Sequence, residues 1–213
     1  MKSCRADAVR CVAVSFALAV AAPCAARGAP ADSPPHPVCE VAVWQSRDFT
    51  TDAPSIYVAN KYVDGSTEQL MDRELRAEMF EPIIKAQPWS AVARASQYRF
   101  VFVSQAIARD AIKALRTSKI RNGPSAEACY LELYVDRQTF LGGAVQSNLM
   151  SEFTLRAFDG SVYRVANGKT FKKTKGFPAK DASGADAANA SFRAAFADNL
   201  NDFIVKKFPP KSQ

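Results

Sequence analysis

The chain has 213 residues, of which 48% are hydrophobic and 23% are charged, a balance typical of a folded domain. This composition excludes a disordered chain and a protein with several membrane spans. The formal net charge is +7, and the chain holds one histidine and five cysteines. A site that needs several imidazoles is therefore excluded.

The first segment predicts export. Basic residues, the last of them Arg10, precede an apolar run over Cys11–Ala22 that small residues and proline follow. This pattern is typical of a secretory signal peptide, and the run is shorter than the roughly 20 residues that cross a bilayer. We expect residues 1–31 to be the signal peptide, although cleavage after Ala26 fits as well and a membrane anchor is the alternative. No transmembrane segment is expected after cleavage.

Cys24 offers a second route to the cell envelope. A bacterial lipid-attachment cysteine follows a short tripeptide of the Leu-Ala-Gly type, whereas Ala21-Ala22-Pro23 precedes Cys24. Proline at this junction fits poorly, and lipidation stays open as an alternative. In either case the expected location is the periplasm or the outer envelope, with secretion as the alternative.

The cysteines that remain after cleavage predict a disulfide. Removal of residues 1–31 leaves only Cys39 and Cys129, an even number in an oxidising compartment. They are far apart and form no CxxC motif, so we expect a structural bridge rather than a redox site. Closing a loop of about 90 residues stabilises a fold by roughly 4 to 5 kcal/mol in the chain-entropy model. Two separate buried thiols are the alternative.

Residues 32–37 form a proline-rich tether, and residues 38–213 are expected to be one domain. The tether holds the only histidine of the chain, His36. We expect its imidazole to be inert, and binding of a metal at the new N-terminus is the alternative. We expect no metal and no cofactor.

The domain begins with a short strand over Val38–Trp44, followed by an irregular stretch over residues 46–65. Ser66 and Gln69 form a capping box that opens a helix. Apolar residues recur every four positions in this helix, and Pro82 is expected to kink or end it.

A second strand and helix follow. Aromatic and β-branched residues alternate over Tyr98–Val103, a strand pattern. Ser104 then caps a helix to about Ser118, with an apolar stripe and basic residues on its other faces.

A meander of strands comes next. Strands are predicted over Cys129–Phe140, Val145–Phe158 and Ser161–Ala166, with turns at Gly142-Gly143 and Asp159-Gly160 between them. The dipeptide Asn167-Gly168 predicts a third hairpin turn. One face of the first two strands is apolar and must be covered.

The cover is an amphipathic helix over Phe192–Phe208, which Pro209-Pro210 ends. The predicted fold is therefore α+β: a single domain with a largely antiparallel sheet, a C-terminal β-meander and helices packed on one face.

The C-terminal half resembles a known group of proteins. The strand over Leu131–Phe140, the hairpin from Glu152 to Gly160, the aromatic strand exit at Phe171 and the helix over Phe192–Phe208 resemble the small α+β modules of Gram-negative envelope-assembly proteins. These include auxiliary components of lipid-transport ABC systems and lipopolysaccharide-assembly lipoproteins. The resemblance implies a non-catalytic protein that binds proteins or lipid, while the helix after Ser104 departs from it.

One segment is a candidate binding surface. Lysines and phenylalanines are interleaved between positions 169 and 177, and ammonium groups attract the phosphates of lipids while aromatic rings enter the membrane interface. A solvated hairpin whose lysines protect a sheet edge is the alternative, and no nucleic acid is expected as a partner of an exported protein. The expected partner is an envelope protein or an anionic lipid. The residues are Lys169, Phe171, Lys172, Lys173, Lys175 and Phe177.

The chain lacks the residues of common catalytic sites. A catalytic triad with serine or cysteine as nucleophile needs a histidine, and residues 38–213 contain none. No glycine-rich phosphate-binding loop occurs in the sequence. We expect no enzyme activity. The alternative is a secreted hydrolase with a Ser-Lys dyad or paired carboxylates, such as Glu127 with Glu132 or Asp72 with Glu74.

Overall fold

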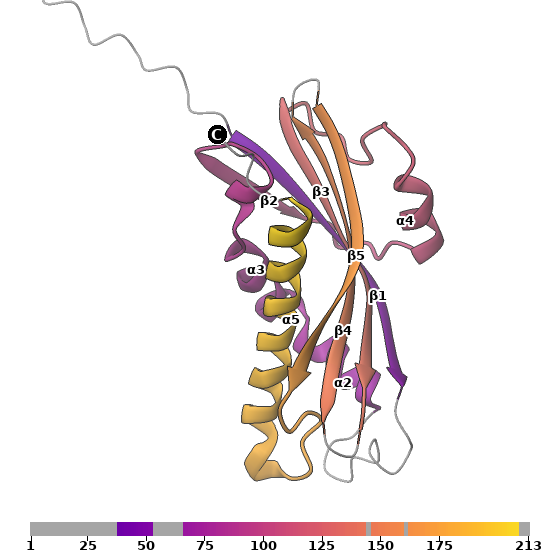
Figure 1. Cartoon of the computed structure of the whole chain (residues 1–213), viewed down its shortest axis with the longest axis vertical. Helices are drawn as coiled ribbons and strands as arrows, with labels where there is room; N and C mark the ends of the chain where they lie inside the picture. The colour runs from indigo at the N-terminus through magenta and orange to yellow at the C-terminus, as the bar shows by residue number, and fades with distance from the viewer. Residues whose placement is uncertain (1–37, 53–65, 144–145, 160–161, 209–213) are drawn as a thin grey trace, which may run out of the picture. The chain divides into compact units, whose positions relative to one another are not determined.

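The structure is a computed structural model that describes residues 38–52, 66–143, 146–159 and 162–208 (Figure 1). The predicted signal peptide, the tether with His36, and Cys24 lie outside the described residues. None of the helices in the described ranges is long and apolar enough to cross a membrane.

A five-stranded mixed sheet organises the chain, with strand order β2-β1-β3-β4-β5. β1 runs parallel to both of its neighbours, whereas β3, β4 and β5 form an antiparallel meander. The α+β fold class is confirmed. The bounds are β1 Val38–Asp52, β2 Gln97–Phe102, β3 Cys129–Leu141, β4 Ser147–Asp159 and β5 Val162–Thr174.

β1 is twice as long as its apolar core predicts. The expected strand ends at Trp44, but β1 continues to Asp52 because β3 offers partners along this whole length. The pairing slips between Gln45 and Asp48, where Arg47 has a φ of 56°. A polar stretch can thus extend a strand when a long neighbour supplies its hydrogen bonds.

The predicted turn at Asn167-Gly168 is wrong. β5 runs without a break from Val162 to Thr174 and pairs with β4 throughout. Gly168 lies opposite Phe153, and a Cβ atom at Gly168 would approach the Phe203 ring of α5 to 3.7 Å. Gly168 therefore lies within the strand and next to α5, not in a turn.

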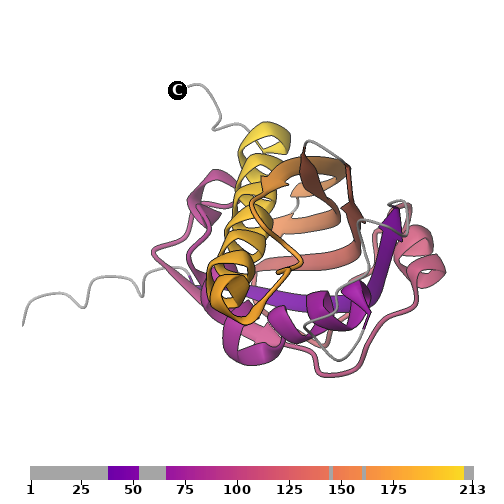
Figure 2. The same ribbon diagram turned by 90° about the horizontal axis from the view of Figure 1, so that it is seen from below.

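The main core lies between one face of the sheet and the helices α2, α3 and α5 (Figure 2). α5 provides a buried stripe that packs on β4 and β5, as the periodicity predicted. Two phenylalanine contacts tie the layers together, because the Phe153 ring lies 5.8 Å from Phe196 and 5.4 Å from Phe203. The helix bounds are α2 Thr67–Glu74, α3 Ala77–Lys85, α4 Arg109–Leu115 and α5 Ala185–Lys207, with short 3-10 turns over Trp89–Ala91 and Ala182–Gly184.

The helix that opens at Ser66 is broken in two. Its capping box is present, since Ser66 and Gln69 exchange side-chain and backbone hydrogen bonds. The break falls at Leu75 and Arg76, and Arg76 adopts an extended backbone. Pro82 lies inside α3 without ending it. Proline cannot donate to the carbonyl four residues earlier, but Pro82 is on the exposed side of the helix, where water can hydrogen-bond to that carbonyl.

α4 differs from the other helices in place and length. The predicted helix over Ser104–Ser118 is reduced to Arg109–Leu115. The residues from Val103 onward continue along β1 instead, and the Val103 and Ile107 amides donate to β1 carbonyls. α4 lies on the opposite face of the sheet from α5, where Ile112 packs in a smaller cluster around Trp44 (Figures 1 and 2).

The predicted disulfide is confirmed. Cys39 and Cys129 are bonded, and both sulfurs are buried in the main core.

Candidate functional site

The lysine and phenylalanine residues of β5 divide between the two faces of the sheet. Side chains alternate along a strand, so Lys169, Phe171 and Lys173 project from the face opposite α5. Lys169 forms an ion pair with its cross-strand neighbour Glu152 at 3.2 Å. Phe171 is 55% exposed, which is unusual for a phenylalanine in a strand.

Lys172 projects to the other face and meets α5. Its Nζ atom lies 2.9 Å from the carboxylate of Asp202, which also accepts from Lys206 at 3.0 Å. The hydrogen bonds from both lysines lower the pKa of Asp202. Lys172 therefore joins β5 to α5 in addition to any role in binding.

Phe177 does not belong to the surface, which corrects its assignment as a binding residue. It is 3% exposed, and its ring stacks on Phe192 with the centroids 4.6 Å apart. Phe140 closes the other side at 5.8 Å. Gly176, with a φ of 70°, turns the chain inward after the exposed Lys175.

The C-terminal turn of α5 adds charge to the same edge of the sheet. A hollow of about 420 Å³ lies beside β5, with Phe203 at its base. Two exposed lysines of α5 reach this hollow, and Gly168 allows the approach, since Lys207 Cε lies within 3.2 Å of where a Cβ would stand. We name the basic edge after its exposed members: Lys169, Phe171, Lys173, Lys206 and Lys207.

The basic edge carries excess positive charge. Together with Lys172 it presents five ammonium groups, against the carboxylates of Asp202 and Glu152. Lys173 and Lys207 have no ion pair among the residues that the structure describes. These two lysines keep their charge available to a partner.

The carboxylates considered for catalysis are all paired with arginine. Glu127 pairs with Arg99, and Asp72 pairs with Arg47 at 2.7 Å. Glu74 accepts from Arg193, and Glu132 from Arg156. Each of these carboxylates therefore has a guanidinium partner at hydrogen-bond distance.

The sequence analysis missed a polar network buried beneath α4. Arg156 and Glu132 are both fully buried, and Arg156 also donates to the backbone carbonyls of Ser118 and Ile120. Tyr134 donates to Glu132 at 2.9 Å, and burial raises the pKa of that tyrosine. The signal was present as Glu132, Tyr134 and Asp136, three polar residues on alternate positions of a strand.

Asp136 and Glu152 extend this network toward α4. Arg116 donates to Asp136 at 2.5 Å, yet burial outweighs the arginine and raises the pKa of Asp136. Glu152 shows the opposite balance: burial opposes its ionisation, but hydrogen bonds from Arg109 and Lys169 lower its pKa. Among the described ranges, no group of three or more His, Cys, Asp or Glu side chains could hold a metal ion.

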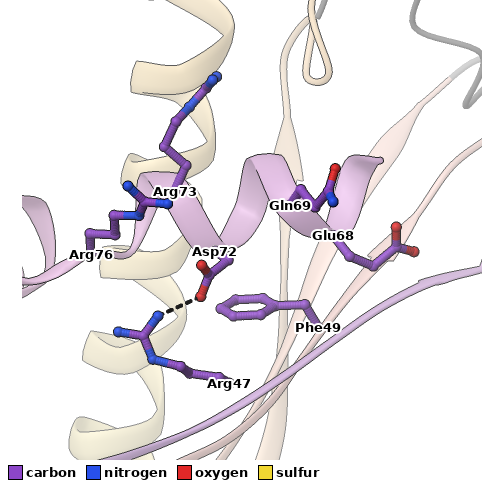
Figure 3. A pocket seen from close by; sticks show the side chains of 7 residues that line it. All are labelled: Arg47, Phe49, Glu68, Gln69, Asp72, Arg73 and Arg76. Atoms are coloured by element: carbon purple, nitrogen blue, oxygen red, sulfur yellow. Dashed lines mark hydrogen bonds and ion pairs between the residues drawn. The ribbon is translucent and has the colours of Figure 1, made fainter. Parts of the chain in front are cut away.

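A second hollow, of about 510 Å³, lies between β1 and α2 (Figure 3). The ion pair between Arg47 and Asp72 crosses it next to the Phe49 ring. Arg73 and Arg76 also line the hollow, but Figure 3 shows both side chains extending away from Phe49. The three guanidinium groups therefore do not converge on one point.

No family model and no curated protein matches the chain. Among solved structures, it is similar to a hypothetical protein, CT253, from Chlamydia trachomatis, with 9% identity and a TM-score of 0.34 over 79% of this chain and 98% of that one. It is also similar to lipoprotein GNA1162 from Neisseria meningitidis, with 12% identity and a TM-score of 0.28 over 77% of this chain and 99% of that one. Both TM-scores are below 0.5, so these similarities give no information on function.

Proposed function

We propose that this protein is an exported, non-catalytic binding protein of the cell envelope, and that its basic edge engages an anionic lipid surface. The observation that carries the proposal is the meeting of lysines from β5 and from the end of α5 around the exposed ring of Phe171. These residues are distant in the sequence, and the fold brings them to one edge of the sheet.

The composition of this edge suits a membrane interface. Each lysine near an anionic surface contributes about 1 kcal/mol, and an aromatic ring gains by leaving water for the interface. Phe171 lies between Lys169 and Lys173 on one face of β5, so the ring and both ammonium groups can meet a surface together. A purely solvating lysine cluster gives no reason to expose the phenylalanine.

The disulfide supports export. Cys39 and Cys129 form a bond that persists in oxidising compartments and is rare in the cytosol. An envelope location places the basic edge where lipid phosphates are available.

The test is retention on vesicles. We choose Lys173→Glu with Lys207→Glu, because neither lysine has an ion pair among the described residues, so their reversal breaks none there. Loss of two charge contacts weakens binding to vesicles of phosphatidylglycerol and phosphatidylcholine by on the order of 30-fold. Phe171→Ser is expected to weaken binding at high salt, where the ring contributes most.

The matched control reverses Arg76 and Lys119, two exposed basic residues outside the basic edge that have no ion pair among the described residues. This variant has the same net charge as the test variant, and its retention should be close to that of the wild type. Equal retention of the wild type, the control and the variant with Lys173→Glu and Lys207→Glu at low salt would contradict the lipid proposal.

A further inference from the structure

A third hollow, of about 220 Å³, opens where the parallel strand β2 ends. In sheets with parallel strands, ligands bind outside the carboxyl ends of the strands, where the chain turns away. β1 and β2 form such a pair, joined through α2 and α3. The lining residues are Val43, Gln45, Arg47, Ala77, Phe80, Glu81, Phe102, Val103 and Ser104.

The wall formed by β1 is distorted at this point. The register shift between Gln45 and Asp48 inserts an irregularity into the strand, and Arg47 adopts the left-handed φ of 56°. A non-glycine residue in this region costs of order 1 kcal/mol or more and persists only when its surroundings hold it there. Such bulges redirect side chains next to binding sites.

The floor of the hollow is apolar. Val43 is 2% exposed, and Phe80 and Phe102 meet edge to face with their centroids 6.1 Å apart. Each comes from a different element, so β1, α3 and β2 all contribute. The volume corresponds to roughly seven water molecules, which fits a small organic molecule and not a long chain.

Two polar side chains around the hollow, those of Arg47 and Gln45, offer hydrogen-bond donors. Arg47 uses its Nη1 for Asp72 and retains further N–H groups, while its side chain is 45% exposed. The Gln45 amide nitrogen is buried without a partner among the described residues. The first residue of α3, Ala77, lines the hollow. The N-cap residue Arg76 makes no side-chain capping hydrogen bond to this helix among the described residues. Glu81, the one carboxylate in the lining, is matched by Lys85 at 3.1 Å.

We propose that this hollow binds a small carboxylic acid with a compact apolar body. The apolar part lies against Val43, Phe80 and Phe102, and the carboxylate accepts from Arg47 at the rim. This site is independent of the basic edge, because it is formed by the first half of the domain.

The probe is hexanoate, titrated into the oxidised full-length domain and followed by the chemical shifts of backbone and side-chain amides. We expect shifts at the Gln45 side chain and at Ala77, and tighter binding of hexanoate than of the neutral hexanol. Arg47→Gly removes the guanidinium at a position where glycine suits the backbone, and it should weaken hexanoate at least tenfold while leaving hexanol unchanged.

Ala77→Leu fills the hollow from an exposed position at the start of α3, so it should abolish both ligands without unfolding the protein. The matched control is Arg73→Gln, which removes an arginine that lines the neighbouring hollow only. Unchanged binding in Ala77→Leu, an equal loss in Arg73→Gln, or no hexanoate binding at millimolar concentration would overturn the proposal. The Lys173→Glu and Lys207→Glu variant should bind hexanoate normally, which separates this result from the vesicle test.

Discussion

Cys39 on β1 and Cys129 on β3 are direct partners in the parallel register, with Cα atoms 4.6 Å apart. Their bond therefore joins two neighbouring strands at the centre of the sheet. The two cysteines have a sequence separation of 90, and the segment between them includes β2 and the helices α2, α3 and α4. The disulfide thus closes the first half of the domain into one loop before the meander begins.

Reduction of this bond is expected to cost much of the stability. The chain-entropy model gives about 4 to 5 kcal/mol for a loop of this length. The Cys39→Ala and Cys129→Ala variant should unfold at a clearly lower urea concentration than the oxidised wild type. The reduced wild type is the control and should unfold close to the double variant; a stability equal to that of the oxidised protein would refute a structural role.

The buried pair of Arg156 and Glu132 gives a second prediction. Arg156→Met leaves the Glu132 carboxylate buried without its cation and removes the arginine donor from the Ile120 carbonyl, whereas the Ser118 carbonyl still accepts from Tyr163. Removal of one partner of a buried ion pair costs about 3 to 5 kcal/mol. Urea unfolding followed by circular dichroism measures this loss.

Adding Glu132→Gln to Arg156→Met should recover part of the stability, because the unpaired charge is then gone. A double variant no more stable than Arg156→Met would show that the cost arises from the lost arginine contacts and not from the stranded carboxylate.

Gly168 provides a test of the continuous β5. Leucine at this position meets Phe203 and Lys207 of α5, and the overpacked helix should lose about 1 to 3 kcal/mol of stability. Asn167→Leu is the matched control, because Asn167 is exposed on the other face. If Gly168 were in a solvent-exposed turn, both substitutions would have similar effects on the melting temperature.

Local patterns predicted the elements whose own residues decide their structure. The capping box at Ser66, the strand from Cys129 and the apolar stripe of α5 are examples. The errors occurred where a neighbouring strand decides the structure: β3 extends β1 to Asp52, and β4 pairs with β5 through Asn167 and Gly168. A single sequence carries no direct record of these contacts.

The candidate site divides in the same way. The lysines of β5 predicted the positive charge of the basic edge. The fold shows in addition that Lys206 and Lys207 belong to this edge and that Phe177 is buried away from it. The hollow beside Arg47 was not predictable, because its walls come from three elements and depend on a register shift.

Asp136 predicts how stability depends on pH. Burial raises the pKa of this carboxyl in the folded protein above its ordinary value of 3.8, in spite of Arg116. Between the unfolded and the raised pKa the folded state binds more protons, so Asp136 favours folding at low pH and loses this contribution as the pH rises through the window. Asp136→Asn removes the titration, and the stability of the variant relative to the wild type should increase as the pH rises above 3.8 and through the raised pKa. Urea unfolding at several pH values measures the difference between the two proteins. Loss of the ion pair with Arg116 shifts this stability difference by a constant amount at all pH values. A stability difference that stays constant or decreases as the pH rises would contradict the raised pKa.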